Sequence, residues 1–193
     1  GWRRVMAGGN LSSGLNGLRM DLNHTHSDGW RDATAYDRIG GTIRWDRSGQ
    51  DGSLKTLIGF STIDQQTAGS SSLQEDDYLS IPTRNLTPIS YRAVQALRVS
   101  TDYQRASGAT LWNVIPYFRY NTMDLLANWS LAFDPTEYET ANTSIGVLAK
   151  VRRDFAPMRT QVVAGLDVDL SRGGRHEYQI VPGQTMTPNG KTV

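Results

Sequence analysis

Two long runs of alternating residues constrain this chain more than any other feature. In residues 15–22, Leu18, Met20 and Leu22 alternate with Arg19 and Asp21. In residues 162–170, Val, Ala and Leu alternate with residues that include Asp167 and Asp169. A period of two marks a strand with one apolar and one polar face. Full charges along so long a polar face are typical of a transmembrane barrel strand, with lipid on one side and water on the other.

Length and composition exclude several classes. A chain of 193 residues with a net charge of +1 fits one domain or a large part of one. Its 38% hydrophobic residues argue against disorder, and its balanced charge gives no argument for a nucleic-acid partner. No run of about 18 apolar residues is present, so no transmembrane helix is predicted. Because cysteine is absent, there is no disulfide framework.

The same periodicity, with frequent β-branched and aromatic residues, predicts about eight strands. They cover residues 2–9, 15–25, 36–46, 53–63, 91–105, 109–122, 142–154 and 159–171. Most are longer than the usual strand of about 5–6 residues and suit a tilted membrane crossing. Pro116 cannot donate a ladder hydrogen bond, so it predicts a bulge or a sheet edge. Leu57 and Leu148 interrupt the polar face.

The connections alternate in length. Short, turn-rich segments at 10–14, 47–52, 106–108 and 155–158 alternate with long ones at 26–35, 64–90 and 123–141, and a fourth opens at Arg172. Outer-membrane barrels have short periplasmic turns and long outer loops. We therefore expect an all-β fold, an antiparallel up-and-down transmembrane β-barrel segment of about eight strands. Its two edges would be open, so we expect residues 1–193 to be part of a larger barrel.

Six segments in this order resemble TonB-dependent outer-membrane receptors of the ferric-siderophore type. They are Ser27-Asp28-Gly29-Trp30-Arg31-Asp32 followed by Tyr36-Asp37-Arg38, then Arg84-Asn85-Leu86-Thr87-Pro88, Met123-Asp124-Leu125-Leu126, and Asn128-Trp129-Ser130-Leu131 with Asp134-Pro135-Thr136. The resemblance implies a barrel of about 22 strands, plugged by an N-terminal domain that residues 1–193 lack, along with the remaining strands. It also implies a Gram-negative outer membrane and a TonB complex engaged through the plug.

Ligand-binding candidates lie in or beside the long loops. Aromatic rings there can stack on a planar ligand, and arginines can bind an anionic one; the candidates are Trp30, Arg31, Tyr36, Tyr78, Arg84, Trp129 and Tyr138. The alternative for the aromatics is an interfacial girdle or loop packing. The alternative for the charged group Asp28, Arg31, Asp32 and Arg38 is an ion-pair network at the loop base.

Two other clusters are weaker. His24 and His26 share one strand face, but the sequence offers no third ligand at metal-binding spacing, which favours histidines at the membrane interface. The acidic run 75–77 lacks the spacing of a calcium loop and is better interpreted as a solvated loop. We expect no metal, no cofactor and no catalytic residue, and so no enzyme.

The favoured function is active transport of a ferric siderophore across the outer membrane, with outer-membrane lipid and the TonB complex as partners. Cobalamin, haem or an oligosaccharide are alternative ligands. A passive, porin-like barrel and a soluble β-sandwich binding module are the competing classes of protein.

Overall fold

The structure is a computed structural model that describes residues 1–67, 72–126 and 136–180. Its eight strands are β1 (Trp2–Ser13), β2 (Asn16–Ser27), β3 (Tyr36–Ser48), β4 (Gly52–Gln66), β5 (Tyr91–Ser107), β6 (Thr110–Leu126), β7 (Thr136–Phe155) and β8 (Thr160–Gln179). A helix, α1 (Glu75–Ser80), lies between β4 and β5, and a 3₁₀ turn, η1 (Ala156–Met158), joins β7 to β8. No helix of the described residues is long and apolar enough to cross a membrane.

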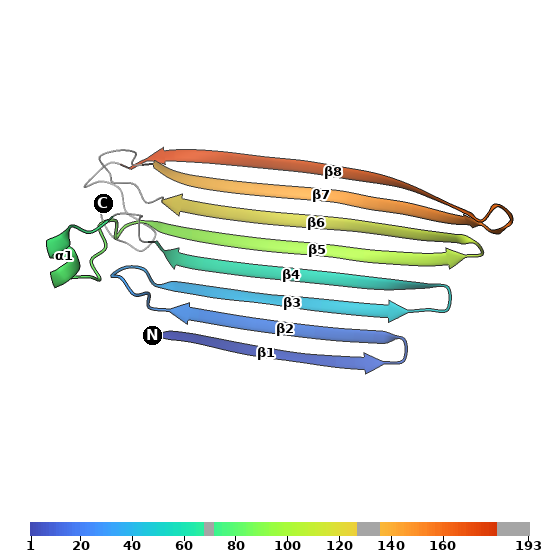
Figure 1. The fold of residues 1–193 in the computed structure, drawn as a ribbon, viewed down its shortest axis with the longest axis horizontal. Coiled ribbons are helices and arrows are strands. Elements are labelled where there is room, and N and C mark those ends of the chain that lie inside the picture. The colour runs from blue at the N-terminus through green and yellow to red at the C-terminus, as the bar shows by residue number, and fades with distance from the viewer. Residues whose placement is uncertain (68–71, 127–135, 181–193) are drawn as a thin grey trace.

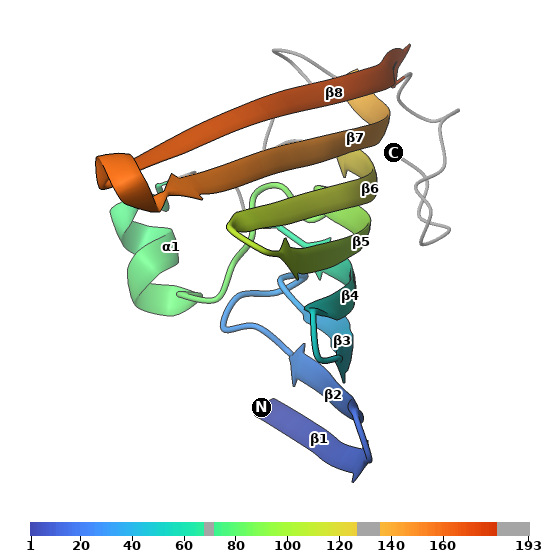
Figure 2. The same cartoon turned by 90° about the vertical axis from the view of Figure 1, so that its right-hand side faces the viewer.

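All eight strands form one sheet in chain order, and every neighbouring pair is antiparallel. Figure 1 shows the strands side by side, with the hairpin turns at one end and the long connections at the other. Figure 2 shows that the sheet twists and curves across its width, as strand sterics require. The predicted up-and-down antiparallel sheet, open at both edges, is confirmed, and the β-sandwich alternative is wrong because there is no second sheet among the described residues.

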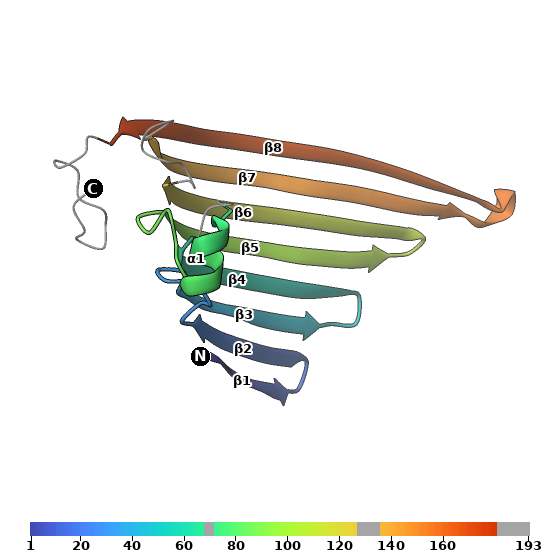
Figure 3. The same ribbon diagram turned by 60° about the vertical axis from the view of Figure 1, so that its left-hand side comes forward.

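The turns at the hairpin end are tight. Two residues separate β1 from β2 and β5 from β6. Gly14 and Gly108 take positive φ angles of 55° and 57° in these turns, and two-residue hairpins favour glycine at such positions. Figure 3 shows α1 at the opposite end of the sheet, where the long connections lie.

The register divides the side chains into two faces. Directly paired residues lie on the same face of the sheet. The ladder pairs Leu22 of β2 with Gly41 of β3, and Gly41 with Phe60 of β4. All the apolar alternating residues fall on this side, which we term the apolar face: Leu18, Met20, Leu22, Ile39, Ile43, Val147, Val162, Leu166 and Val168. The opposite side, the polar face, carries Arg19, Asp21, Arg44, Arg98, Lys150 and Asp167.

Little of this sheet is buried within the chain. The buried hydrophobic residues of the described chain are Tyr91, Leu126 and Ile180, with Ile89 packed against them at the long-loop end. On the apolar face, by contrast, Leu166 is 65% exposed and Leu170 63% exposed. The sheet therefore presents an extensive apolar surface without a covering layer among the described residues.

Several predicted boundaries are wrong. β8 continues to Gln179, so no loop opens at Arg172. β6 reaches Leu126 and β7 begins at Thr136, so residues 123–126 and Tyr138 are in strands, although we predicted a loop. The ends of β7 and β8 were missed because they carry polar residues on both faces. The end of β6 was missed because Asp124 lies on the apolar face and Leu125 on the polar face, which removes the period-two signal. The helix α1 was not predicted.

Pro116 also behaves differently from the prediction. It lies in β6, an interior strand, opposite Val147. The β5–β6 ladder has no paired residues between Ser100–Tyr117 and Tyr103–Val114, yet its register is the same on both sides of this gap. Pro116 thus interrupts the hydrogen bonds without a bulge or an edge, because the missing donor is tolerated where the flanking pairs hold the strands.

Candidate functional site

Two long connections meet at the end of the sheet opposite the hairpin turns, which we term the loop end. The Asp32 amide donates a hydrogen bond to the Thr83 carbonyl at 2.9 Å, and the Asn85 side-chain amide donates to the Ala33 carbonyl at 3.3 Å. Next to these contacts, where β3 begins and β4 ends, the Gln66 amide donates a hydrogen bond to the Ala35 carbonyl at 2.8 Å. Residues 28–35 and 72–90 therefore form one joined layer, which we term the loop cap.

The first half of the loop cap is a tight turn closed by Thr34. Its hydroxyl donates to the Arg31 carbonyl at 2.7 Å and accepts from the Arg31 amide at 3.2 Å. Gly29 has a φ angle of 78°, and a Cβ atom there would lie 2.0 Å from the Thr34 hydroxyl oxygen. Only glycine fits both the backbone conformation and the space.

The second half is held by polar side chains that follow α1. Arg84 forms an ion pair with Asp77 at 2.6 Å. The side-chain oxygen Oδ1 of Asn85 accepts a hydrogen bond from the Thr87 backbone amide at 2.9 Å. Asparagine favours this kind of local turn between side chain and backbone. Arg84 is thus engaged in holding the loop, and its guanidinium is not free to bind a ligand in this conformation.

Several of the predicted residues lie in or beside the loop cap. Trp30 is 68% exposed, and the Arg31 guanidinium lies 4.6 Å from the centre of its ring. Arg31 Nε is buried without a hydrogen-bond partner among the described residues. Tyr78 is 64% exposed on α1, and Tyr36 accepts a hydrogen bond from the Trp2 indole at 3.2 Å. Trp129 lies outside the described residues.

The predicted ion-pair network at the loop base does not form among the described residues. Asp28 pairs instead with His26, at 2.9 Å. Arg31 faces the Trp30 ring, and the Asp32 backbone contacts Thr83. This leaves the charges of Arg31 and Arg38 without a carboxylate partner in the described chain.

A row of five residues, four of them with polar groups, crosses the polar face at the end of the sheet that carries the loop cap. The register aligns Tyr36, Gln65, Arg92, Leu125 and Tyr138 across five neighbouring strands. Arg92 donates to the Gln65 side chain at 2.7 Å, while its Nε is buried without a partner among the described residues. We term these five residues the rim row.

Arginines flank the rim row at both sides of the sheet. Arg38 lies two residues after Tyr36 on β3, on the same face and nearer the hairpin end. On β8, the Arg175 guanidinium lies 4.2 Å from the centre of the Tyr138 ring and pairs with Glu177 at 2.8 Å. Sequence reasoning missed Gln65, Arg92 and Arg175, because only the cross-strand register shows that they share a row with Tyr36 and Tyr138.

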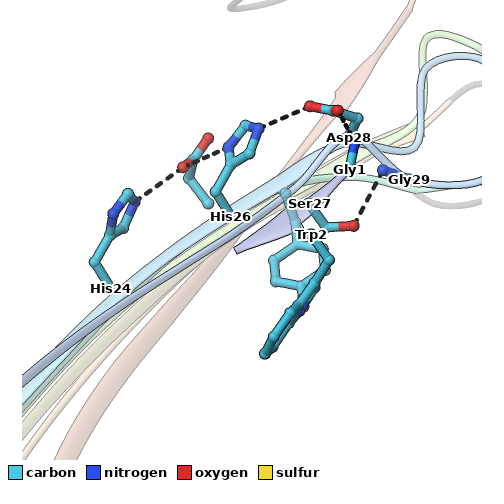
Figure 4. A network of polar contacts seen from close by, with 9 residues as sticks. Gly1, Trp2, His24, His26, Ser27, Asp28 and Gly29 are labelled. Carbon is cyan, nitrogen blue, oxygen red and sulfur yellow. Dashed lines mark hydrogen bonds and ion pairs between the residues drawn. The ribbon is translucent and has the colours of Figure 1, made fainter. Parts of the chain in front are cut away.

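The two histidines on β2 form part of a polar chain (Figure 4). Asp37 Oδ1 lies 3.1 Å from His24 Nε2 and 2.9 Å from His26 Nδ1, across the β2–β3 ladder. Asp37 is the carboxylate partner that sequence spacing did not reveal. Within the described residues, no group of three or more His, Cys, Asp or Glu side chains is arranged to hold a metal ion.

Comparison with known proteins gives a match of fold. No known family profile matches the chain, and no curated protein sequence matches it. Among solved structures, the ferric citrate transporter FecA in its unliganded form superposes with a TM-score of 0.74 at 13% sequence identity. The alignment covers 100% of this chain and 29% of that transporter. The eight strands therefore share the fold of a segment of that transporter, and this chain spans less than a third of its length.

Proposed function

We propose that this chain forms part of the wall of an outer-membrane transport receptor. In this proposal the loop cap captures an anionic ferric chelate of the siderophore or citrate type. The chelate then passes along the polar face towards the hairpin end, driven by the TonB complex. No catalytic step is proposed. The fold shared with the ferric citrate transporter supports the architecture, and the residues at the loop cap support the ligand class.

The observation that carries the proposal is the set of arginines in the loop cap and on the polar face next to it. Arg31, Arg38 and Arg92 lie at one end of the sheet without a carboxylate partner among the described residues. Arg92 and Arg31 each keep a buried, unsatisfied Nε, and a buried donor without a partner is costly. Carboxylate or catecholate oxygens of a chelate would satisfy these donors, since arginine binds such groups with charge-assisted hydrogen bonds.

The division between the two faces supports placement in a bilayer. Large apolar side chains cover one face in a continuous band, and charged residues cover the other. A barrel wall in the outer membrane needs this arrangement, with lipid outside and a polar interior.

Ligand binding to the full-length protein in detergent tests the proposal. The panel contains ferric citrate, a catecholate and a hydroxamate ferric siderophore, haem, cobalamin and a neutral oligosaccharide, with tryptophan fluorescence as the signal. We expect an anionic ferric chelate to bind, and Arg92→Gln to weaken it about 10-fold, equivalent to about 1.4 kcal/mol. Arg159→Gln, in the turn after η1, is the matched control at the opposite end of the sheet.

Two results would contradict the proposal. Equal losses in the Arg92 and Arg159 variants would show that the rim row does not bind the chelate. Uptake into cells that continues at the same rate after the proton-motive force is abolished would favour the porin-like alternative, because a passive pore needs no energy.

A further inference from the structure

A groove runs along the apolar face over β6, β7 and β8. Its upper part, towards the loop end of the sheet, has a volume of about 330 Å³, and its lining includes Trp112, Val114, Ala149 and Leu166. Its lower part, towards the hairpin end, has a volume of about 360 Å³. This part is lined by Ser107, Thr110, Trp112, Val151, Arg153, Phe155, Val162 and Ala164. The two parts share Trp112, Val151 and Ala164, so they are continuous. Each has the size of a small-molecule site, about 300–1,000 Å³.

The register explains why the surface is hollow here. Val114, Ala149 and Leu166 form one row across the three strands, and Trp112, Val151 and Ala164 form the next. In each row, a small alanine lies beside a larger side chain, which leaves a channel along the strands. Because every side chain of these two rows is apolar, the channel suits a hydrocarbon chain.

The lower end of the groove is polar and positively charged. Ser107, Thr110 and Arg153 lie in one row at the hairpin end of the apolar face. Arg153 is exposed, and its guanidinium lies 5.4 Å from the centre of the Phe155 ring. It has no ion-pair partner among the described residues, although the neighbouring Arg152 pairs with Asp154 on the other face. The groove is therefore amphipathic, with one apolar end and one cationic end.

Charge on the apolar face of β3 to β7 shows the same polarity. Below the apolar band, at the hairpin end, the charged residues of β3, β5 and β7 on this face are Arg47, Arg105 and Arg153. At the loop end, a single row across β3 to β7 carries Asp37, Asp64, Asp124 and Glu139. An anionic headgroup is thus attracted to the hairpin end and repelled from the loop end.

We propose that this groove binds one anionic glycerophospholipid of the leaflet at the hairpin end. Its phosphate contacts Arg153, with the hydroxyls of Ser107 and Thr110 as additional donors, and one acyl chain lies against Trp112, Ala149 and Ala164. An indole at this depth is typical of a membrane–water interface. The inference rests on the bilayer placement within the proposed function, but not on the identity of the transported ligand.

Native mass spectrometry of the full-length protein, exchanged into mixed micelles with phosphatidylglycerol or phosphatidylcholine, tests the site. We expect one phosphatidylglycerol to be retained in preference to phosphatidylcholine. Arg153→Gln should weaken this retention about 5-fold, equivalent to about 1 kcal/mol per basic residue near an anionic lipid surface. Arg98→Gln, on the polar face of β5, is the matched control and should leave it unchanged.

A second pair of variants tests the acyl-chain end without changing charge. Ala164→Phe fills the shared part of the groove and should abolish selective retention, whereas Ala7→Phe, on the apolar face of β1, should not. Retention that is unchanged in both Arg153→Gln and Ala164→Phe would overturn the proposal. So would equal loss in the control variants, or displacement of the lipid by inorganic phosphate, which would show a simple anion site. Lipid selectivity with no ferric-chelate binding would support this site and contradict only the proposed ligand.

Discussion

The two faces of the sheet differ in how far the chain itself satisfies them. On the polar face, several charges are neutralised locally: Arg19 pairs with Asp21 at 2.8 Å and Arg44 with Asp46 at 2.7 Å. On the apolar face, the side chains of Ile145, Leu166 and Leu170 remain more than half exposed. The polar face can therefore meet water unaided, while the apolar face requires a nonpolar medium. This difference between the faces is the one that the proposed barrel wall requires, with lipid against the apolar face and water against the polar face.

The largest effect should follow from placing a charge on the apolar face. Leu166→Arg should destabilise the full-length protein by about 2–4 kcal/mol if it faces the bilayer centre, because the guanidinium must leave water. The neighbouring Asp167→Arg, on the polar face, should change the stability within about 0.5 kcal/mol. A refolding titration in lipid vesicles measures both. Equal costs for the two substitutions would break the distinction between the faces.

A smaller effect should follow from crowding the polar face. A Cβ atom on Gly146 would lie 2.5 Å from the Val168 carbonyl oxygen and 2.4 Å from the Tyr117 hydroxyl. Gly146→Ala must shift the backbone of β8, and overpacking of this kind costs about 1–3 kcal/mol. Gly59→Ala is the control on the same face, since its Cβ would have no atom within 4 Å. We expect it to be neutral or stabilising in the same titration, and destabilisation by both variants would show that the two sites are equally crowded.

The two faces were predictable from sequence, while the assembled site was not. Alternation is a local signal, so Leu18, Met20 and Leu22 are sufficient to assign a face to β2. The rim row depends on non-local pairing: nothing near Arg92 in the chain indicates that Gln65 will lie opposite it. The same holds for Asp37, which joins His24 and His26 only across the β2–β3 ladder.

Loop geometry explains the remaining differences. The contact of Asp32 with Thr83 joins segments about fifty positions apart, and no periodicity encodes it. Trp30 and Arg31 were predicted as ligand residues, and that role stays a prediction; the structure adds that the Arg31 guanidinium lies over the Trp30 ring. Arg84 was predicted as a ligand residue from its loop position, but its ion pair with Asp77 gives it a structural role in this conformation.

The smallest effect should come from the charge pairs of the polar face. Arg119 and Tyr117 both donate to the Asp169 carboxylate, and the Arg119 and Asp169 side chains are 44% and 39% exposed. A double-mutant cycle with Arg119→Met and Asp169→Asn should give a coupling free energy of about 0.2–1 kcal/mol, since water screens exposed pairs. The coupling should fall further as salt is raised. A larger coupling that does not respond to salt would mean that the polar face is held in a dry environment, and that the sheet does not separate lipid from water in the way the comparison of its two faces indicates.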